Sequence, residues 1–140
     1  MVLDIEDFKT LFKGPIIDST GTLLSDWKAI IDTGTFIRVA DTATNTTTTL
    51  YTVPTGKVFY LVETTLSFVN DSTNQNNVAI IAGGGTVALI RAVGVANEHN
   101  VVGVSYPIPV KIAAAATVQV QSSAANLVAW GSIFGYEVSE

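Results

Sequence analysis

The pattern of apolar and polar positions changes near Gly34. Before this residue, apolar side chains recur every three or four positions, and after it they alternate with polar ones almost to the end. The first spacing is that of an amphipathic helix, and the second is that of a β-strand with one buried face. The sequence therefore predicts a helical N-terminal arm, residues 1–34, followed by an all-β domain, residues 35–140.

Two short helices are expected in the arm. Asp4 can cap the start of the first helix, and Gly14 can end it. Its apolar face comprises Ile5, Phe8, Leu11 and Phe12. The second runs from a Ser25 cap to Gly34, with Trp27, Ile30 and Ile31 as its apolar residues. Helices this short need a surface to cover, either an open end of their own β-domain or another subunit. We prefer docking on a neighbouring subunit.

The β-domain contains about eight strand patterns separated by turn-forming residues. The expected strands are residues 36–40, 50–53, 58–68, 78–82, 86–95, 102–112, 117–121 and 128–138. This number of short strands predicts an antiparallel β-sandwich, and a jelly roll is favoured over an immunoglobulin-like order. Pro107 and Pro109 lack backbone N–H groups, so their strand should lie at a sheet edge or bend between sheets.

The alternation also predicts which side chains are buried. Expected core residues are Val62, Phe68, Val104, Ile108, Val118 and Val120. In the last strand, Ala129, Gly131 and Gly135 share the face opposite the large side chains. Because small residues let another backbone approach, these three are candidate interaction residues. The other candidates are Phe8, Leu11, Phe12, Trp27 and Ile30 in the arm.

Charge is scarce after the arm. Charged residues make up 14% of the chain, against roughly 25% in an average soluble domain. Of the nineteen charged residues (seven Lys and Arg, twelve Asp and Glu), only eight lie in residues 42–140. The outer strand faces should therefore be neutral, or partly covered by neighbouring subunits. A Thr-rich sandwich that is fully surrounded by water remains the alternative.

The composition also limits the range of partners. The formal net charge of −5 comes without a basic stripe, whereas phosphate binding needs clustered Lys and Arg. We therefore expect no nucleic-acid partner. The acids Asp4, Glu6 and Asp7 stand where a secretory signal would be basic, and residues 78–96 alternate as strands do. We expect neither export by that route nor a membrane partner, and synthesis in the cytoplasm.

Catalytic chemistry has few residues to draw on. The chain has one histidine, His99, in an expected turn, and no cysteine, so we expect no enzyme, no cofactor and no zinc site. Asp71, in the Asn-rich loop 70–77, is a candidate calcium ligand, although an ordinary polar loop is the preferred interpretation. Gly83-Gly84-Gly85 lacks the Lys and Ser/Thr of a phosphate-binding loop and predicts a turn.

The aromatic residues allow two interpretations. A sugar-binding platform could be built from Tyr51, Tyr60, Tyr106, Trp130 and Tyr136. Most of them share the apolar side of their strands, so we prefer core packing. Aromatic residues buried between subunits would favour a structural role, whereas a solvent-facing cluster on one sheet would favour sugar binding.

The segment around Val53-Pro54-Thr55-Gly56-Lys57 resembles a recurring pattern in small β-sandwich proteins of tailed-phage particles. The pattern has a strand, then Val-Pro-x-Gly-Lys, then an apolar strand, an Asn-rich turn such as residues 70–77, and a closing Gly-containing strand such as 131–138. The resemblance covers roughly residues 47–138 and not the arm. It supplies no catalytic residues.

This resemblance implies a virion structural protein of a bacteriophage, synthesised in the host cytoplasm. The implied types are head decoration, cement, fibre and spike proteins, which are commonly homotrimers. Its partners would be copies of itself and other virion proteins, such as the major capsid protein. The alternative is a carbohydrate- or receptor-binding β-sandwich with surface glycans as ligands.

Overall fold

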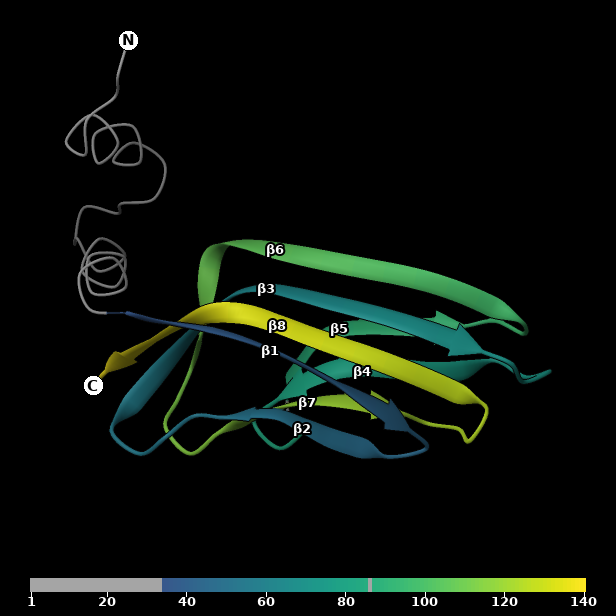
Figure 1. Ribbon diagram of the computed structural model, residues 1–140, viewed down its shortest axis with the longest axis horizontal. Helices are drawn as coiled ribbons and strands as arrows, with labels where there is room; N and C mark the ends of the chain where they lie inside the picture. The colour runs from purple at the N-terminus through teal and green to yellow at the C-terminus, as the bar shows by residue number, and fades with distance from the viewer. Residues whose placement is uncertain (1–33, 86) are drawn as a thin grey trace, which may run out of the picture.

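A computed structural model describes residues 34–85 and 87–140, which form two antiparallel sheets of four strands each, stacked face to face (Figure 1). The strands are β1 (Thr35–Thr44), β2 (Thr47–Thr52), β3 (Lys57–Asn70), β4 (Asn76–Ala82), β5 (Val87–Gly94), β6 (Glu98–Ile112), β7 (Thr117–Ser122) and β8 (Leu127–Ser139). The two helices expected in the arm lie outside the described residues. In the described part of the chain, no helix is long and apolar enough to cross a bilayer.

The first sheet has the strand order β1-β8-β3-β6, and the second has the order β2-β7-β4-β5. Every recorded strand pair is antiparallel. Strands distant in sequence are therefore neighbours, and the chain passes repeatedly between the layers. This order is consistent with the doubly wound Greek keys of a jelly roll. The predicted all-β sandwich is confirmed.

The turn after β2 follows from its sequence. Pro54 fixes one backbone angle, and Gly56 adopts a φ of 74°, in the left-handed region that glycine tolerates. The N–H of Lys57 donates a hydrogen bond to the carbonyl of Pro54 at 3.2 Å. This tight turn sends β3 into the first sheet directly after β2 has ended in the second.

The core fills the space between the two sheets. Its largest fully buried apolar side chains are those of Phe59, Phe68, Leu61, Leu66, Ile80, Leu127, Ile133, Val53, Val78, Val118 and Val120. Three of the residues predicted for the core, Phe68, Val118 and Val120, are buried there, and Val104 packs against its margin. Val62 is half-buried and is not part of the core, and Ile108 is 55% exposed, so the prediction was wrong for both residues.

A β-bulge in β3 explains why the predicted face of this strand is wrong in part. The register shifts between Leu61 and Glu63 in the pairings with both neighbouring strands. One extra residue reverses the alternation of side chains. Phe59 and Leu61 therefore belong to the main core, whereas Val58 and Tyr60 form a separate small cluster with Val138. The expectation that Val62 lies in the core together with Phe68 is wrong for the same reason.

Ile108 is exposed because β6 departs from its partner. Across from the bulge, Leu61 pairs with Val110 and Glu63 pairs with Ser105, so residues 106–109 have no partner in that register. Pro107 and Pro109 lie in this stretch, and β6 is an edge strand of the first sheet. Of the two positions predicted from the prolines, the sheet edge is confirmed.

Asn70 anchors the loops at one end of the sandwich. Its side chain is completely buried. The amide Nδ2 donates to the carbonyls of Asn74, Gly94 and Val95 at 3.0, 2.8 and 3.0 Å, and Oδ1 accepts from the N–H of Ser72 at 3.2 Å. One amide thus satisfies backbone groups of the loop after β3, of the end of β5 and of the turn that follows β5.

Candidate interaction face

The last strand presents its large side chains to the outside of the sandwich. Trp130 is 43% exposed, and Phe134 and Tyr136 lie on the same side of β8. Core packing was the preferred interpretation for Trp130 and Tyr136, and for Trp130 it is wrong. The prediction holds for Tyr60, which is 5% exposed, while Tyr106 packs against the core and its hydroxyl lies 3.1 Å from that of Thr64.

The candidate interaction residues of β8 face the interior. Ala129 is fully buried, and Gly131 and Gly135 are buried too. A Cβ at Gly131 would lie 2.8 Å from the Cβ of Val120, and one at Gly135 would meet the carbonyl oxygen of Tyr60. Gly131 thus lets the two sheets approach each other, whereas Gly135 leaves room for the backbone and the Phe59 ring of the neighbouring strand β3. The expectation that they form an external face is therefore corrected.

The remaining candidates from the sequence, Phe8, Leu11, Phe12, Trp27 and Ile30, lie outside the described residues. The exposed face itself was missed because alternation shows that a strand has two different faces but not which one is inside. The available signal was the large size of the aromatic side chains on β8, because the neighbouring strand β3 already supplies large residues such as Phe59 and Phe68 to the core.

Three aromatic rings form a cluster on the outside of the first sheet. The ring centroids of Phe36 and Phe134 are 4.7 Å apart, and those of Phe134 and Tyr136 are 5.6 Å apart. Phe36 is 57% exposed, although an exposed aromatic ring leaves apolar area in contact with water. We call Phe36, Phe134 and Tyr136 the aromatic cluster.

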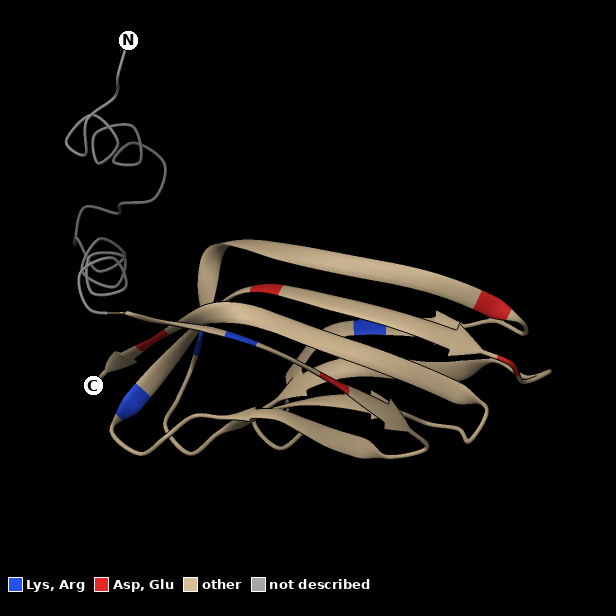
Figure 2. Cartoon of the chain, viewed as in Figure 1, with Lys and Arg blue, Asp and Glu red and all other residues tan. Residues whose placement is uncertain are grey.

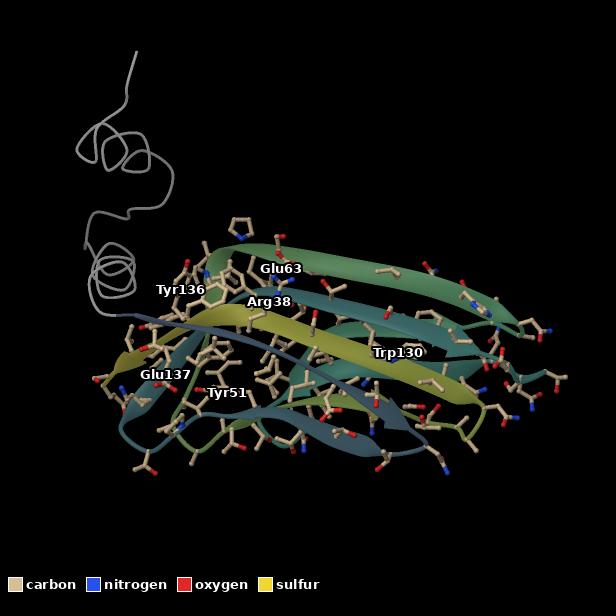
Figure 3. All side chains as sticks on the ribbon, in the orientation of Figure 1. Arg38, Tyr51, Glu63, Trp130, Tyr136 and Glu137 are labelled. Atoms are coloured by element: carbon tan, nitrogen blue, oxygen red, sulfur yellow. The ribbon has the colours of Figure 1, made fainter. Side chains whose placement is uncertain are left out.

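Two charged residues flank this cluster. In the strand register, Arg38 of β1 and Glu63 of β3 both lie opposite Phe134, one on each side of β8. Figure 3 shows Arg38, Glu63 and Tyr136 grouped in one region of the first sheet, with Trp130 further along the sheet. A hollow of about 250 Å³ is lined by Phe36, Arg38, Glu63, Thr65, Ser132, Ile133 and Phe134.

A second hollow, of about 410 Å³, lies beside Trp130. Ser67 of β3 is paired with Trp130 on one side and with Val101 on the other, so a small side chain separates two large apolar ones. Val101 is 65% exposed. His99 and Asn100 also line this hollow and give it polar groups.

The outside of the second sheet has a different character. It presents Thr and Gln side chains from β2 and β7, and the Gln119 amide donates to the Thr49 hydroxyl at 3.3 Å. Exposed large apolar residues on this sheet are Val87 and Val93, both on its edge strand β5. Charged residues are few on either sheet (Figure 2). The two outer faces are therefore chemically distinct.

A polar link joins the sheets at the end of the sandwich where the chain ends. The Tyr51 hydroxyl of β2 donates a hydrogen bond to the Glu137 carboxylate of β8, and the Lys57 Nζ lies 3.7 Å from the same carboxylate. Figure 3 shows Tyr51 and Glu137 close together at this end. Burial, with the hydrogen bond to Glu137 and its negative charge, raises the pKa of Tyr51. The arrangement therefore links β2 of the second sheet to β8 of the first.

The candidate calcium ligand is exposed. The Asp71 carboxylate lies 3.9 Å from the His99 imidazole, and both side chains are mostly in solvent. Within residues 34–85 and 87–140, no group of three or more His, Cys, Asp and Glu side chains could hold a metal ion. His99 belongs to the start of β6 and not to the preceding turn. The Asn-rich loop is instead held by hydrogen bonds among its own residues and to Asn70.

The fold thus defines a two-sheet β-sandwich with one apolar outer face. No protein-family model matches the sequence, and no curated protein matches it. Among solved structures, a chain of the acidic stable capsid structure of Helicobacter pylori bacteriophage KHP30 is similar, with a TM-score of 0.51 and 14% identity. The alignment covers 78% of this chain and 95% of that chain. At this identity, the likeness shows a shared fold.

Two other solved chains have lower scores. A pentameric capsid protein isolated from metagenomic phage sequences gives a TM-score of 0.39 at 18% identity, covering 99% of this chain and 91% of that one. A chain from Bacillus endospore appendages, which form disulfide-linked pili, gives 0.36 at 14% identity, covering 76% and 86%. Scores this low carry no structural argument.

Proposed function

We propose that this chain is a non-enzymatic structural protein of a virus particle, whose copies assemble through the outer face of the first sheet. The observation that carries the proposal is the exposure of Phe36, Val101 and Trp130 on that one face, at 57%, 65% and 43%. Exposed large apolar side chains gathered on one face are typical of an interaction site. The fold shared with a phage capsid chain supports the same reading.

More specifically, we propose a homotrimeric decoration, cement or spike protein that docks through residues 1–34 and resides in the virion. The low charge after residue 41 supports an assembled state, because interface centres are poor in charged residues. The resemblance of residues 47–138 to phage particle proteins supports the type. Partners would be copies of the chain and other virion proteins such as the major capsid protein.

The test is the mass of the full chain in solution at several concentrations. We expect a concentration-dependent oligomer that Phe36→Ser or Trp130→Ser weakens by about tenfold or more, equivalent to about 1.4 kcal/mol. Val87→Ser and Val93→Ser are matched controls, because these residues are about equally exposed, 51% and 50%, but lie on the second sheet. A chain that remains monomeric at all concentrations would contradict the proposal.

A second function has one observation in its favour. Trp130 stands beside a hollow that also contains Ser67, His99 and Asn100, and a flat aromatic ring next to polar groups suits a sugar. If the chain is a carbohydrate-binding module, Trp130→Ala abolishes binding to a glycan array while the mass in solution is unchanged. Loss of assembly without any glycan binding supports the structural role instead.

A further inference from the structure

A row of small side chains crosses the outer face of the first sheet. The strand register places Ala40 of β1 opposite Ser132 of β8, Ser132 opposite Thr65 of β3, and Thr65 opposite Gly103 of β6. The row therefore extends over all four strands. None of its side chains is large, and two of its members, Thr65 and Ser132, line the hollow of about 250 Å³ beside Phe134. The row therefore forms a floor between larger neighbours.

Larger side chains stand on both sides of this floor. On one side, Phe134 lies between Arg38 and Glu63, and on the other, Trp130 lies opposite Ser67, which is opposite Val101. Phe134 and Trp130 are four residues apart on one strand, about 13 Å at the usual rise per residue. We call the depression between them the outer groove.

The dimensions of the outer groove suit a short α-helix. A helix with its side chains is about 10–12 Å wide, close to the spacing of about 13 Å between the two backbone positions, so a helix lying along the floor would touch both rings. Four strands spaced at about 4.8 Å span roughly 14 Å from first to last, and a helix of ten residues is about 15 Å long. One helix of that length could therefore cover the floor from β1 to β6.

We propose that the outer groove binds residues 4–13 of a neighbouring copy of this chain, an inference that rests on the proposed function. The sequence of this segment predicts a helix of that length with Phe8, Leu11 and Phe12 on one face. Its polar face carries both signs of charge, as in Asp7 and Lys9. The groove wall likewise offers both signs, in Arg38 and Glu63.

The position of the segment in the chain makes this contact between copies feasible. Residues 1–33 precede β1, which is itself an edge strand of the sheet that carries the groove. The twenty-one residues from 14 to 34 can span up to about 70 Å when extended. That reach exceeds the width of the sheet, so segment 4–13 can cross to an adjacent subunit.

The absence of cysteine from the chain permits a direct test. One full-length variant carries Leu11→Cys and a second carries Ser132→Cys, and the two are mixed under mild oxidation. We expect a disulfide that joins one chain of each variant. Thr47→Cys, at an exposed position of the second sheet, replaces Ser132→Cys in the matched control and should cross-link at least about tenfold less.

The mass in solution is measured on the same samples. If the mixture assembles but Leu11→Cys does not cross-link to Ser132→Cys above the control, the groove assignment is overturned and the proposed function stands. A third variant carries both Leu11→Cys and Ser132→Cys in one chain. The assignment is also overturned if a disulfide forms only within that chain and not between the two single variants. If the chain stays monomeric, both fail. In a further pair, the groove cysteine is placed at Thr65→Cys, and Leu11→Cys is kept in the other chain. Adding Ser132→Arg to the Thr65→Cys chain fills the groove with a large side chain and should lower the cross-linking.

Discussion

The hydroxyl of Tyr51 donates a hydrogen bond to the carboxylate of Glu137, and the two residues come from opposite sheets. The side chain of Glu137 is only 11% exposed, and the Nζ of Lys57 lies 3.7 Å from the same carboxylate. A carboxylate this far from water needs such donors. The pair therefore closes the end of the sandwich with a polar contact, where the ring of Tyr51 also packs against Phe59.

Replacing Tyr51 by Phe should lower the free energy of unfolding by about 1–2 kcal/mol, because a hydrogen bond to a charged, largely buried group is lost while the ring is retained. Chemical denaturation at neutral pH measures the change. Tyr136→Phe is the control, since Tyr136 lies on the outer face and the change removes only its hydroxyl. Equal effects of the two substitutions would show that the contact with Glu137 contributes nothing.

The same contact predicts a dependence on alkaline pH. Burial, followed by the hydrogen bond and charge of Glu137, raises the pKa of Tyr51, whereas tyrosine in the unfolded chain ionises near pH 10. The contribution of Tyr51 is thus complete below about pH 10 and decreases as the pH rises further. The stability difference between the natural chain and Tyr51→Phe should shrink above pH 10, and a constant difference would contradict the assignment.

Asn70→Ala should be among the most destabilising single changes, at about 2–4 kcal/mol. It leaves the buried carbonyl of Gly94 and the partly buried carbonyl of Val95 without the amide that donates to them, and an unsatisfied buried group costs about 1–3 kcal/mol. Asn76→Ala, in the same loop but partly exposed, is the control and should cost less than about 1 kcal/mol. Thermal or denaturant unfolding distinguishes the two.

Gly131→Ala should destabilise the sandwich by about 1–3 kcal/mol, because the new methyl group would lie 2.8 Å from the Cβ of Val120 in the facing sheet. Combining it with Val120→Ala relieves that clash. We expect the double variant to be more stable, by about 1 kcal/mol, than the sum of the two single effects implies. Strict additivity would place Gly131 away from the interface between the sheets.

His99→Ala should leave assembly unchanged, within about tenfold in affinity, roughly 1.4 kcal/mol. The imidazole is 69% exposed, and its nearest carboxylate, that of Asp71, is 3.9 Å away and equally exposed. Such a pair contributes little in water. A larger loss with the fold intact, measured by mass in solution, would show that the hollow beside Trp130 contributes to the contact.

All eight strands of the described region could be predicted from the sequence, because period-two alternation and turn residues such as Pro54 and Gly56 are local signals. What the sequence did not show was where the alternation reverses. The extra residue at Val62 moves Val58 and Tyr60 out of the main core, and a bulge depends on pairing with strands distant in sequence. The local sequence pattern therefore does not indicate the bulge.

The inner face of β8 was missed for a related reason. Large side chains at Trp130, Phe134 and Tyr136 suggest burial when the strand is considered alone. In the sandwich, the inner face of β8 adds Leu127 and Ile133 to the core, and its other inner positions have room only for small residues, because Val120 of β7 lies against Gly131 and Phe59 of β3 against Gly135. Core volume is shared among strands, and no single strand reveals its own share.

The irregular edge strand β6 affects how the chain behaves before it meets a partner. An exposed strand edge can recruit further strands from other molecules without limit and start a fibril. Pro107 and Pro109 withhold two N–H groups on that edge, and residues 106–109 leave the ladder altogether. Strand addition along residues 106–109 is therefore hindered, which favours association through the side-chain faces of the sheets.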